Sequence, residues 1–391
     1  MSFVFNLVAL ALPLVVLQLL VLPMMGRTMD GDRYGFVVAI FAFFSLMPGV
    51  LGNSLNNIRL IHESDWAAEE EGGFNLLQIV FAIIGAMAVA IYAALNGYLG
   101  VSDLVLIAAT GLLWTIREYG CVAFLIDMDY RSILLNSVVM SSGYLLGYVA
   151  FLATGCWILV FFVGQVLSVA YIFARTGLKN GGVAKSDRFG SLVRESLILS
   201  ASTFVARSAS YCDRVILYPL IGGASVAVYY SATLVPKLVN MVASSMNSVI
   251  LSFLSKRSKI QRNELLLVLA ASFAVCVVCY GVVMAIAPLI LSLLYPQFTE
   301  AALPLLPIVT ATAFVVVLST IVSPYVLKFR PIRWQMIVSI VSLVFYLAAA
   351  LVLLYWFGLI GFCIGALLAE TGRFTALLMI FIFGKGRQCV E

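Results

Sequence analysis

The chain has 391 residues, of which 63% are hydrophobic and only 10% are charged, and its formal net charge is +5. Soluble globular domains are about 45–50% apolar and about 25% charged, so this composition excludes a soluble domain. The apolar runs are continuous over about 20 residues, which favours membrane-spanning helices over the short alternating strands of a transmembrane barrel. The sequence therefore predicts an all-α polytopic membrane protein.

Catalytic and metal-binding groups are scarce. His62 is the only histidine, which disfavours histidine-ligated zinc and Ser-His-Asp catalysis. The basic residues are scattered over separate loops, so no nucleic-acid partner is expected. We therefore expect a protein that is not an enzyme and that holds no metal and no cofactor, with H⁺ or Na⁺ as the only ion it would couple to.

Twelve apolar segments are predicted along the chain, each long enough to cross a core of about 30 Å at about 1.5 Å per residue. Their ranges are 3–24, 34–55, 75–95, 104–126, 132–153, 155–175, 196–220, 224–252, 265–293, 302–327, 334–356 and 358–383. The first has neither a basic start nor a small-residue cleavage site, so it is interpreted as a retained span rather than a signal peptide.

Lysine and arginine assign the two sides of the membrane. Loops after odd-numbered segments contain only Arg27 and Arg33. Loops after even-numbered segments, with the C-terminal tail, contain Arg59, Arg131, Arg175, Lys179, Lys185, Arg188, Arg194, Lys256, Arg257, Lys259, Arg262, Lys328, Arg330, Arg333, Lys385 and Arg387. This bias predicts a multi-pass protein of the bacterial cytoplasmic membrane with both termini in the cytoplasm.

The longest basic loop divides the segments into two sets of six. We expect an N-terminal six-helix bundle at 1–178, a basic cytoplasmic linker at 179–195 and a C-terminal six-helix bundle at 196–391. Each half begins with a proline, a glycine and a short connection, followed by Tyr34-Gly35 in the first half and by Tyr229-Tyr230 in the second. Two bundles related as a parallel repeat are typical of alternating-access transporters, although two ordinary apolar hairpins would look similar.

Eight charged residues fall inside the predicted spans, where each costs about 2.5–3.5 kcal/mol near the bilayer centre. They are Arg117, Arg207, Arg214, Lys237, Arg373, Glu118, Asp213 and Glu370. Such groups should face a cavity or each other, and their similar depths suggest one central cavity lined by segments 4, 7, 8 and 12. Five cations against three carboxylates give this set a net charge of +2, which suits a phosphate or pyrophosphate.

Segment 7 contains a row of candidate ligands. Arg207, Tyr211 and Arg214 are spaced i, i+4 and i+7, so they share a helical face, with the two guanidinium groups about 10 Å apart along the axis. This row would suit a pyrophosphate. The alternative is a structural ion pair in which Asp213 or another acid neutralises each arginine.

The other charged positions allow similar alternatives. Glu370 and Arg373 are three residues apart and are expected to pair with each other. Arg117 and Glu118 are adjacent and diverge by about 100° around the helix, so one of them should need another partner. Lys237 directly follows a proline that would kink segment 8 at the expected cavity.

The motifs at the start of each half resemble those of the oligosaccharide-lipid and polysaccharide flippases (O-antigen flippase-like) of the multidrug/oligosaccharidyl-lipid/polysaccharide exporter superfamily. The matching residues of the first half are Pro23, Arg27, Asp32, Tyr34, Gly35, Gly49, Gly52 and Arg59. Those of the second half are Asp213, Arg214, Gly222, Gly223, Tyr229 and Tyr230.

This resemblance implies two six-helix bundles that move an undecaprenyl-pyrophosphate-linked oligosaccharide to the outer leaflet for surface polysaccharide biosynthesis. It implies membrane lipids as contacts, and glycosyltransferases and a polymerase of the same pathway as partners. Substrate binding would fall to Arg207, Arg214, Lys237, Arg117, Tyr211 and Arg373. Coupling to H⁺ or Na⁺ would fall to Asp213, Glu118 or Glu370, the carboxylates well inside the spans.

Two other functions stay open at this point. A multidrug cation antiporter of the same superfamily would need a net acidic cavity, which the basic excess disfavours. A membrane glycosyltransferase or polymerase could use Asp30 and Asp32 in the first outer loop, but a helix cap explains these residues equally well. A purely structural role is disfavoured by the cost of keeping charges in the membrane.

Overall fold

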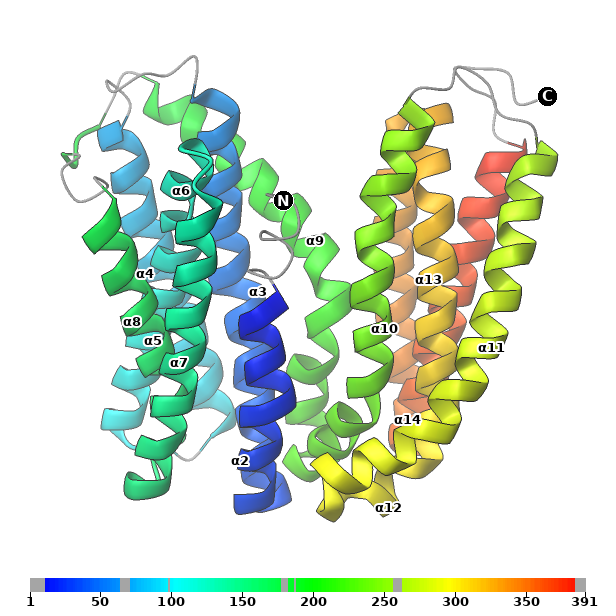
Figure 1. Ribbon diagram of the computed structural model, residues 1–391, viewed down its shortest axis with the longest axis horizontal. Helices are drawn as coiled ribbons and strands as arrows, with labels where there is room; N and C mark the ends of the chain where they lie inside the picture. Colours follow the sequence, from blue (N-terminus) through cyan, green and yellow to red (C-terminus); the bar gives the residue numbers. More distant parts are fainter. Residues whose placement is uncertain are drawn as a thin grey trace. The chain divides into compact units, whose positions relative to one another are not determined.

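The computed structural model describes residues 11–63, 71–97, 99–176, 182–185, 188–255 and 262–383, and every regular element within them is a helix (Figure 1). The chain divides into two compact units, Met1–Val226 and Ala227–Glu391. The first unit contains the π-helical turn η1 (Val16–Val21), α2 (Leu22–Thr28), α3 (Gly31–His62), α4 (Glu71–Asn96), α5 (Val101–Gly120), α6 (Val122–Ile126), α7 (Tyr130–Thr154), α8 (Ile158–Arg175) and α9 (Phe189–Ile221). The second contains most of α10 (Gly223–Ser255), then α11 (Arg262–Leu294), η4 (Pro296–Phe298), α12 (Thr299–Ala302), η5 (Leu303–Leu305), α13 (Leu306–Phe329) and α14 (Ile332–Phe383).

Within these described ranges, nine helical stretches are long and apolar enough to cross a membrane, which confirms the all-α, multi-pass class. The last of them, Met336–Ile382, has 47 residues, far more than the roughly 20 that one crossing needs. Gly358 interrupts it with φ 60° and ψ −145°, so it covers both of the last two expected segments. The total of twelve spans stays a prediction, because α9 and α10 are not among the nine.

Part of the sequence prediction lies outside the described residues. This applies to residues 3–10 of the first expected segment and to the basic residues Lys179, Lys256, Arg257, Lys259, Lys385 and Arg387. The assignment of both termini to the cytoplasm stays a prediction.

Helix α3 organises the first unit, where it contacts α4, α5 and α9 and is largely buried. Small residues on α3 allow this close packing. A Cβ atom at Gly52 would lie 2.6 Å from the carbonyl oxygen of Thr115, so only glycine lets α5 approach here. The remaining helices of the unit are joined through α8, which packs against both α5 and α7.

Helix α9 belongs to the first unit, although the expected segment 196–220 was predicted to begin the second bundle. Its start packs against α3 through an ion pair between His62 and Glu195, with Nε2 and Oε2 2.8 Å apart. Leu192 joins the apolar cluster that contains Leu55 and Tyr119. The compact units divide after Val226, and the division at the 179–195 linker stays a prediction.

The turn between α9 and α10 is held against the start of α3 by a close backbone approach. Gly222 has φ 80°, which favours glycine, and the Asp32 carboxylate accepts a hydrogen bond from the backbone N–H of Ala224 at 2.9 Å. A Cβ atom at Gly35 would lie 1.8 Å from the carbonyl oxygen of Gly223. The glycines of the sequence motif therefore have a packing role here.

In the second unit α13 packs against α14 and α11, and the yellow-to-red helices of Figure 1 show this arrangement. The two halves of α14 fold back on each other after Gly358, since a Cβ atom at Gly365 would lie 2.6 Å from the Cα of Ala350. An apolar cluster including Val322, Phe329 and Phe381 fills the space between α13 and α14.

Candidate functional site

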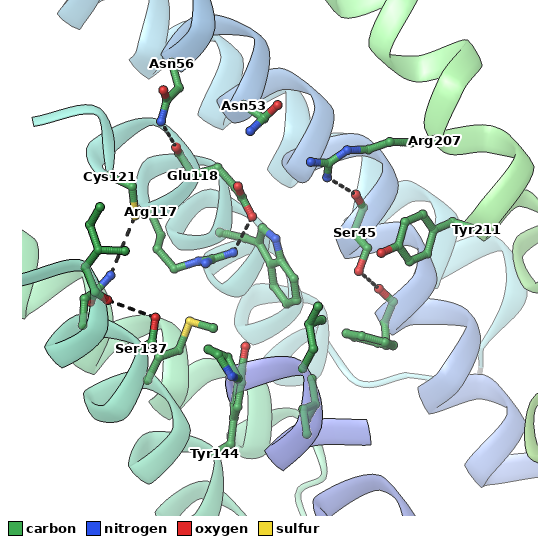
Figure 2. Close-up of a pocket in the computed structure, with 18 of the residues that line it drawn as sticks. Ser45, Asn53, Asn56, Arg117, Glu118, Cys121, Ser137, Tyr144, Arg207 and Tyr211 are labelled. Atoms are coloured by element: carbon green, nitrogen blue, oxygen red, sulfur yellow. Dashed lines mark hydrogen bonds and ion pairs between the residues drawn. The ribbon is translucent and has the colours of Figure 1, made fainter. Parts of the chain in front are cut away.

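A cavity of about 540 Å³ opens among α3, α5, α7, α9 and the N-terminal helix, entirely within the first unit (Figure 2). It is lined by Pro13, Leu14, Leu17, Phe41, Ser45, Asn53, Asn56, Trp114, Arg117, Glu118, Cys121, Leu125, Ile133, Asn136, Ser137, Met140, Tyr144, Arg207, Ser210 and Tyr211. Its volume falls in the range of about 300–1,000 Å³ typical of small-molecule sites, enough for a polar head group but not for a whole lipid.

Helix α5 contributes an ion pair to the cavity. The Arg117 guanidinium donates a hydrogen bond to the Glu118 carboxylate, and Figure 2 shows the two side chains turned toward each other. The expectation that these adjacent residues diverge and need separate partners is therefore wrong. Long side chains bend back across the helix surface, so Cα directions alone do not decide which groups meet. Asn56 fixes the same turn by donating to the backbone oxygen of Glu118 at 3.0 Å.

Helix α9 contributes Arg207 and Tyr211, one turn apart on the same face. The Arg207 side chain reaches toward α3, where its Nη1 donates to the carbonyl oxygen of Ser45 at 3.3 Å (Figure 2). Gly49 makes room for it, because a Cβ atom there would lie 2.8 Å from the same nitrogen. Three sequence-predicted residues, Arg117, Arg207 and Tyr211, thus line one cavity together with Glu118.

Asp213 and Arg214 lie outside this set of cavity-lining residues. Both are buried, with 4% and 2% of their surface exposed. Their side chains approach to 3.8 Å between Arg214 Nε and Asp213 Oδ1, and the same oxygen accepts the backbone N–H of Arg214 at 2.9 Å. The structure therefore places Arg207 and Tyr211 at the cavity but not Arg214, and the binding roles of these residues stay predictions.

The remaining predicted residues belong to the second unit. Glu370 and Arg373 on α14 form the expected pair, with 3.5 Å between Oε1 and Nη1. Lys237 is half-buried on α10, directly after the buried Pro236. A common cavity lined by segments 4, 7, 8 and 12 stays a prediction, because the cavity described here belongs to the first unit alone.

The sequence prediction missed several cavity residues, above all Trp114. This residue lies one turn before Arg117 on α5, and the Arg117 guanidinium carbon is 5.5 Å from the indole centroid. The i, i+3 spacing to a charged residue was the signal that could have identified it. Asn53, Asn56 and Tyr144 were missed because polar residues without a charge stand out less in an apolar run.

The charges of the cavity favour an anion. Two guanidinium groups face one carboxylate among its described lining residues, so the net charge is +1. Guanidinium groups match phosphate and carboxylate geometry through paired N–H donors. Among the residues that the structure describes, no group of three His, Cys, Asp or Glu side chains could hold a metal ion.

The two acids at the start of α3 accept hydrogen bonds from backbone N–H groups. The Asp30 carboxylate caps α3 by accepting the N–H of Arg33 at 3.1 Å, as the capping explanation requires. Asp32 instead accepts the N–H of Ala224 at the start of α10, and neither residue lines the cavity.

We expect Asp30→Asn and Asp32→Asn to leave the activity of the protein unchanged, because the carboxamide oxygen of asparagine also accepts backbone N–H groups. Asp30→Ala should lower the free energy of unfolding by about 1 kcal/mol. Activity in the membrane and the thermal stability of the purified variants would be measured together. Complete loss of activity in a stable Asp→Asn variant would instead support the enzyme function.

No protein-family model matches the sequence, and no curated protein matches it. Solved structures do match. A lipid II flippase MurJ in an inward closed conformation has a TM-score of 0.73 at 12% identity, covering 99% of this chain and 87% of the flippase. A MATE transporter in complex with MaL6 has a TM-score of 0.63 at 14% identity, covering 98% and 95%. An outward-facing multidrug resistance MATE transporter of the MOP superfamily has a TM-score of 0.60 at 14% identity, covering 98% and 94%. The chain therefore has the fold that these flippase and multidrug transporter structures share.

Proposed function

We propose that the protein is an alternating-access flippase that moves a polyprenyl-pyrophosphate-linked oligosaccharide across the cytoplasmic membrane for surface polysaccharide biosynthesis. The observation that carries this proposal is the cavity of the first unit, where Arg117 and Arg207 come from different helices and face a single carboxylate. A net positive cavity inside a membrane protein selects anionic groups, and pyrophosphate is the anionic part of such a lipid. The similarity to a flippase that acts on lipid II supports a lipid-linked substrate.

Under this proposal the ionisable residues have two roles, binding the anionic head group and coupling to an ion. Arg117, Arg207 and Tyr211 bind the head group in the first unit, and Lys237 and Arg373 of the second unit stay predicted binding residues. Arg214 does not line the cavity, and the variants of the Asp213–Arg214 pair test its predicted role in binding. A coupling H⁺ or Na⁺ would use Glu118, Asp213 or Glu370, of which Glu118 lines the cavity beside Arg117.

A multidrug cation antiporter is the second candidate, because one observation favours it. Trp114, Phe41 and Tyr144 line the same cavity as Glu118, and aromatic rings with a carboxylate suit a lipophilic cation. The fold is also that of the MATE transporters. Against this function, the Glu118 carboxylate is already paired with Arg117, so a cation would have to displace a guanidinium group.

The experiment that tests the proposal compares a strain lacking this chain with its parent. Polyprenyl-linked lipids would be extracted and assigned to a membrane leaflet. A complete lipid-linked oligosaccharide retained on the cytoplasmic face, with surface polysaccharide lost, is the expected result. An unfinished glycan would contradict it in favour of an enzyme. Normal lipids with altered sensitivity to cationic drugs would contradict it in favour of the antiporter.

A further inference from the structure

The indole ring of Trp114 is held in place on every side that the structure describes. It stacks on Phe44, with centroids 5.4 Å apart and planes 10° from parallel, and contacts Phe41 at 6.2 Å. The Arg117 guanidinium lies over the ring. Only 6% of the residue is exposed. A ring packed in this way cannot turn its N–H toward a different partner without breaking these contacts.

Among the residues that the structure describes, the N–H group of this ring has no hydrogen-bond partner. Trp114 Nε1 is buried and makes no hydrogen bond, although the residue lines the cavity. Buried donors are almost always paired in native structures, because leaving one unpaired forfeits a hydrogen bond that it would make in water. An unpaired, immobile donor at the wall of a cavity is therefore a position where a ligand acceptor would bind.

A second donor lies at the same place. Arg207 Nη1 is 2.8 Å, and Trp114 Nε1 is 3.9 Å, from the point where a Cβ atom at Gly49 would stand. Gly49 leaves room there for the Arg207 guanidinium, so donors from α5 and α9 lie near each other beside α3. The Arg117 guanidinium carbon is 5.5 Å from the indole centroid, and its Nε is also buried without a hydrogen-bond partner among the described residues. N–H donors from these three side chains suit an oxyanion such as phosphate.

We propose that Trp114 is a ligand-binding residue, whose indole N–H donates to a phosphate oxygen held between the Arg117 and Arg207 guanidinium groups. This inference rests on the proposed function, since it takes the anionic head group as the occupant of the cavity. It assigns the pyrophosphate of the substrate to the first unit. It also explains why an aromatic residue with an N–H stands beside Gly49, where phenylalanine would pack equally well against Phe44.

The test uses full-length protein in detergent, labelled with ¹⁵N at the indole nitrogens of its five tryptophans. The Trp114 signal is assigned from Trp114→Phe, which keeps an aromatic face against Phe44 and Arg117 and removes the N–H together with the five-membered part of the ring. Inorganic pyrophosphate and farnesyl pyrophosphate are titrated, with farnesol as the probe lacking phosphate. We expect the Trp114 indole proton to move downfield with farnesyl pyrophosphate and not with farnesol.

Binding of farnesyl pyrophosphate should weaken about tenfold in Trp114→Phe, as expected for losing one hydrogen bond to a charged acceptor. The matched control is Trp157→Phe, since Trp157 is equally buried in the same unit but does not line the cavity. It should bind as the wild type does. If Trp114→Phe fails to fold, Gly49→Ala closes the space between the two donors, and the Trp114 signal in that variant should no longer respond.

The outcomes separate this inference from the proposed function. Binding that weakens in Arg207→Gln but is unchanged in Trp114→Phe would overturn the role of Trp114 and leave the flippase proposal standing. No binding of either pyrophosphate probe to wild-type protein would overturn both. A shift produced by phosphatidylglycerol and not by the pyrophosphate probes would assign the site to a membrane phospholipid and overturn the substrate assignment.

Discussion

Arg207→Glu is expected to abolish transport while leaving the amount of membrane-inserted protein unchanged. The residue lines the cavity, and its guanidinium makes one hydrogen bond, to the backbone oxygen of Ser45. Reversing its charge changes the net charge of the cavity from +1 to −1, counting Arg117 and Glu118 with it. A pyrophosphate would then be repelled at short range, where low dielectric strengthens the interaction.

Variants of Arg207 that only neutralise the charge, or that keep it, should reduce binding and activity less than Arg207→Glu does. Arg207→Gln removes a charge-assisted contact worth about 1.5–3 kcal/mol, which corresponds to roughly ten- to hundredfold weaker binding. Arg207→Lys should retain part of the activity, because an ammonium keeps the charge but not the paired donors of the guanidinium. Gly49→Ala should act in the same direction, since its Cβ would displace the Arg207 side chain.

The measurement is restoration of surface polysaccharide in a strain lacking the chain, with membrane protein quantified in parallel. Arg194→Gln is the matched control, because Arg194 is an exposed arginine on the same helix that does not line the cavity. It should restore the polymer fully. Full restoration by Arg207→Glu would show that the cavity does not bind an anion through this residue.

Most of the fold could be predicted from hydropathy, because a membrane span needs a continuous apolar run and leaves a clear pattern. The break within α14 could be predicted as well, since the expected segments 334–356 and 358–383 meet at Gly358, where the backbone leaves the helical conformation. The packing of α9 on α3 could not be predicted, because it depends on contacts between residues distant in sequence.

The site could be predicted only in part, because hydropathy identifies costly residues but not their neighbours. Arg117 and Arg207 were found from the cost of a charge in the membrane, and the structure brings them to one cavity. Which side chains pair with each other depends on side-chain conformation, which the sequence does not show. Glu118 folds back onto Arg117. Trp114 was missed because an aromatic residue in an apolar run has no contrast with its surroundings.

Breaking the buried Asp213–Arg214 pair should destabilise the protein more than any surface substitution. Both residues are almost fully buried, and the Asp213 carboxylate also accepts the backbone N–H of Arg214. Removing one partner takes away the ion pair that compensates the other buried charge, and breaking a buried pair in this way costs about 3–5 kcal/mol. We therefore expect Asp213→Leu and Arg214→Met each to lower the thermal stability of the purified protein strongly. Arg194→Met, an exposed change on the same helix, should shift the free energy of unfolding by at most about 0.5 kcal/mol.

The double variant Asp213→Leu with Arg214→Met decides what this pair does. Replacing both members of a buried pair with apolar residues of similar size is often neutral or stabilising, so thermal stability should return close to wild type. We expect transport to return with it, because neither side chain lines the cavity. A stable double variant that does not transport would instead assign Asp213 to ion coupling or Arg214 to substrate binding. Restoring each residue singly would not separate those two roles, because each single variant is destabilised. Asp213→Asn with Arg214 intact would separate them, because it removes the titratable group and keeps the guanidinium, and its carboxamide oxygen can still accept the backbone N–H of Arg214.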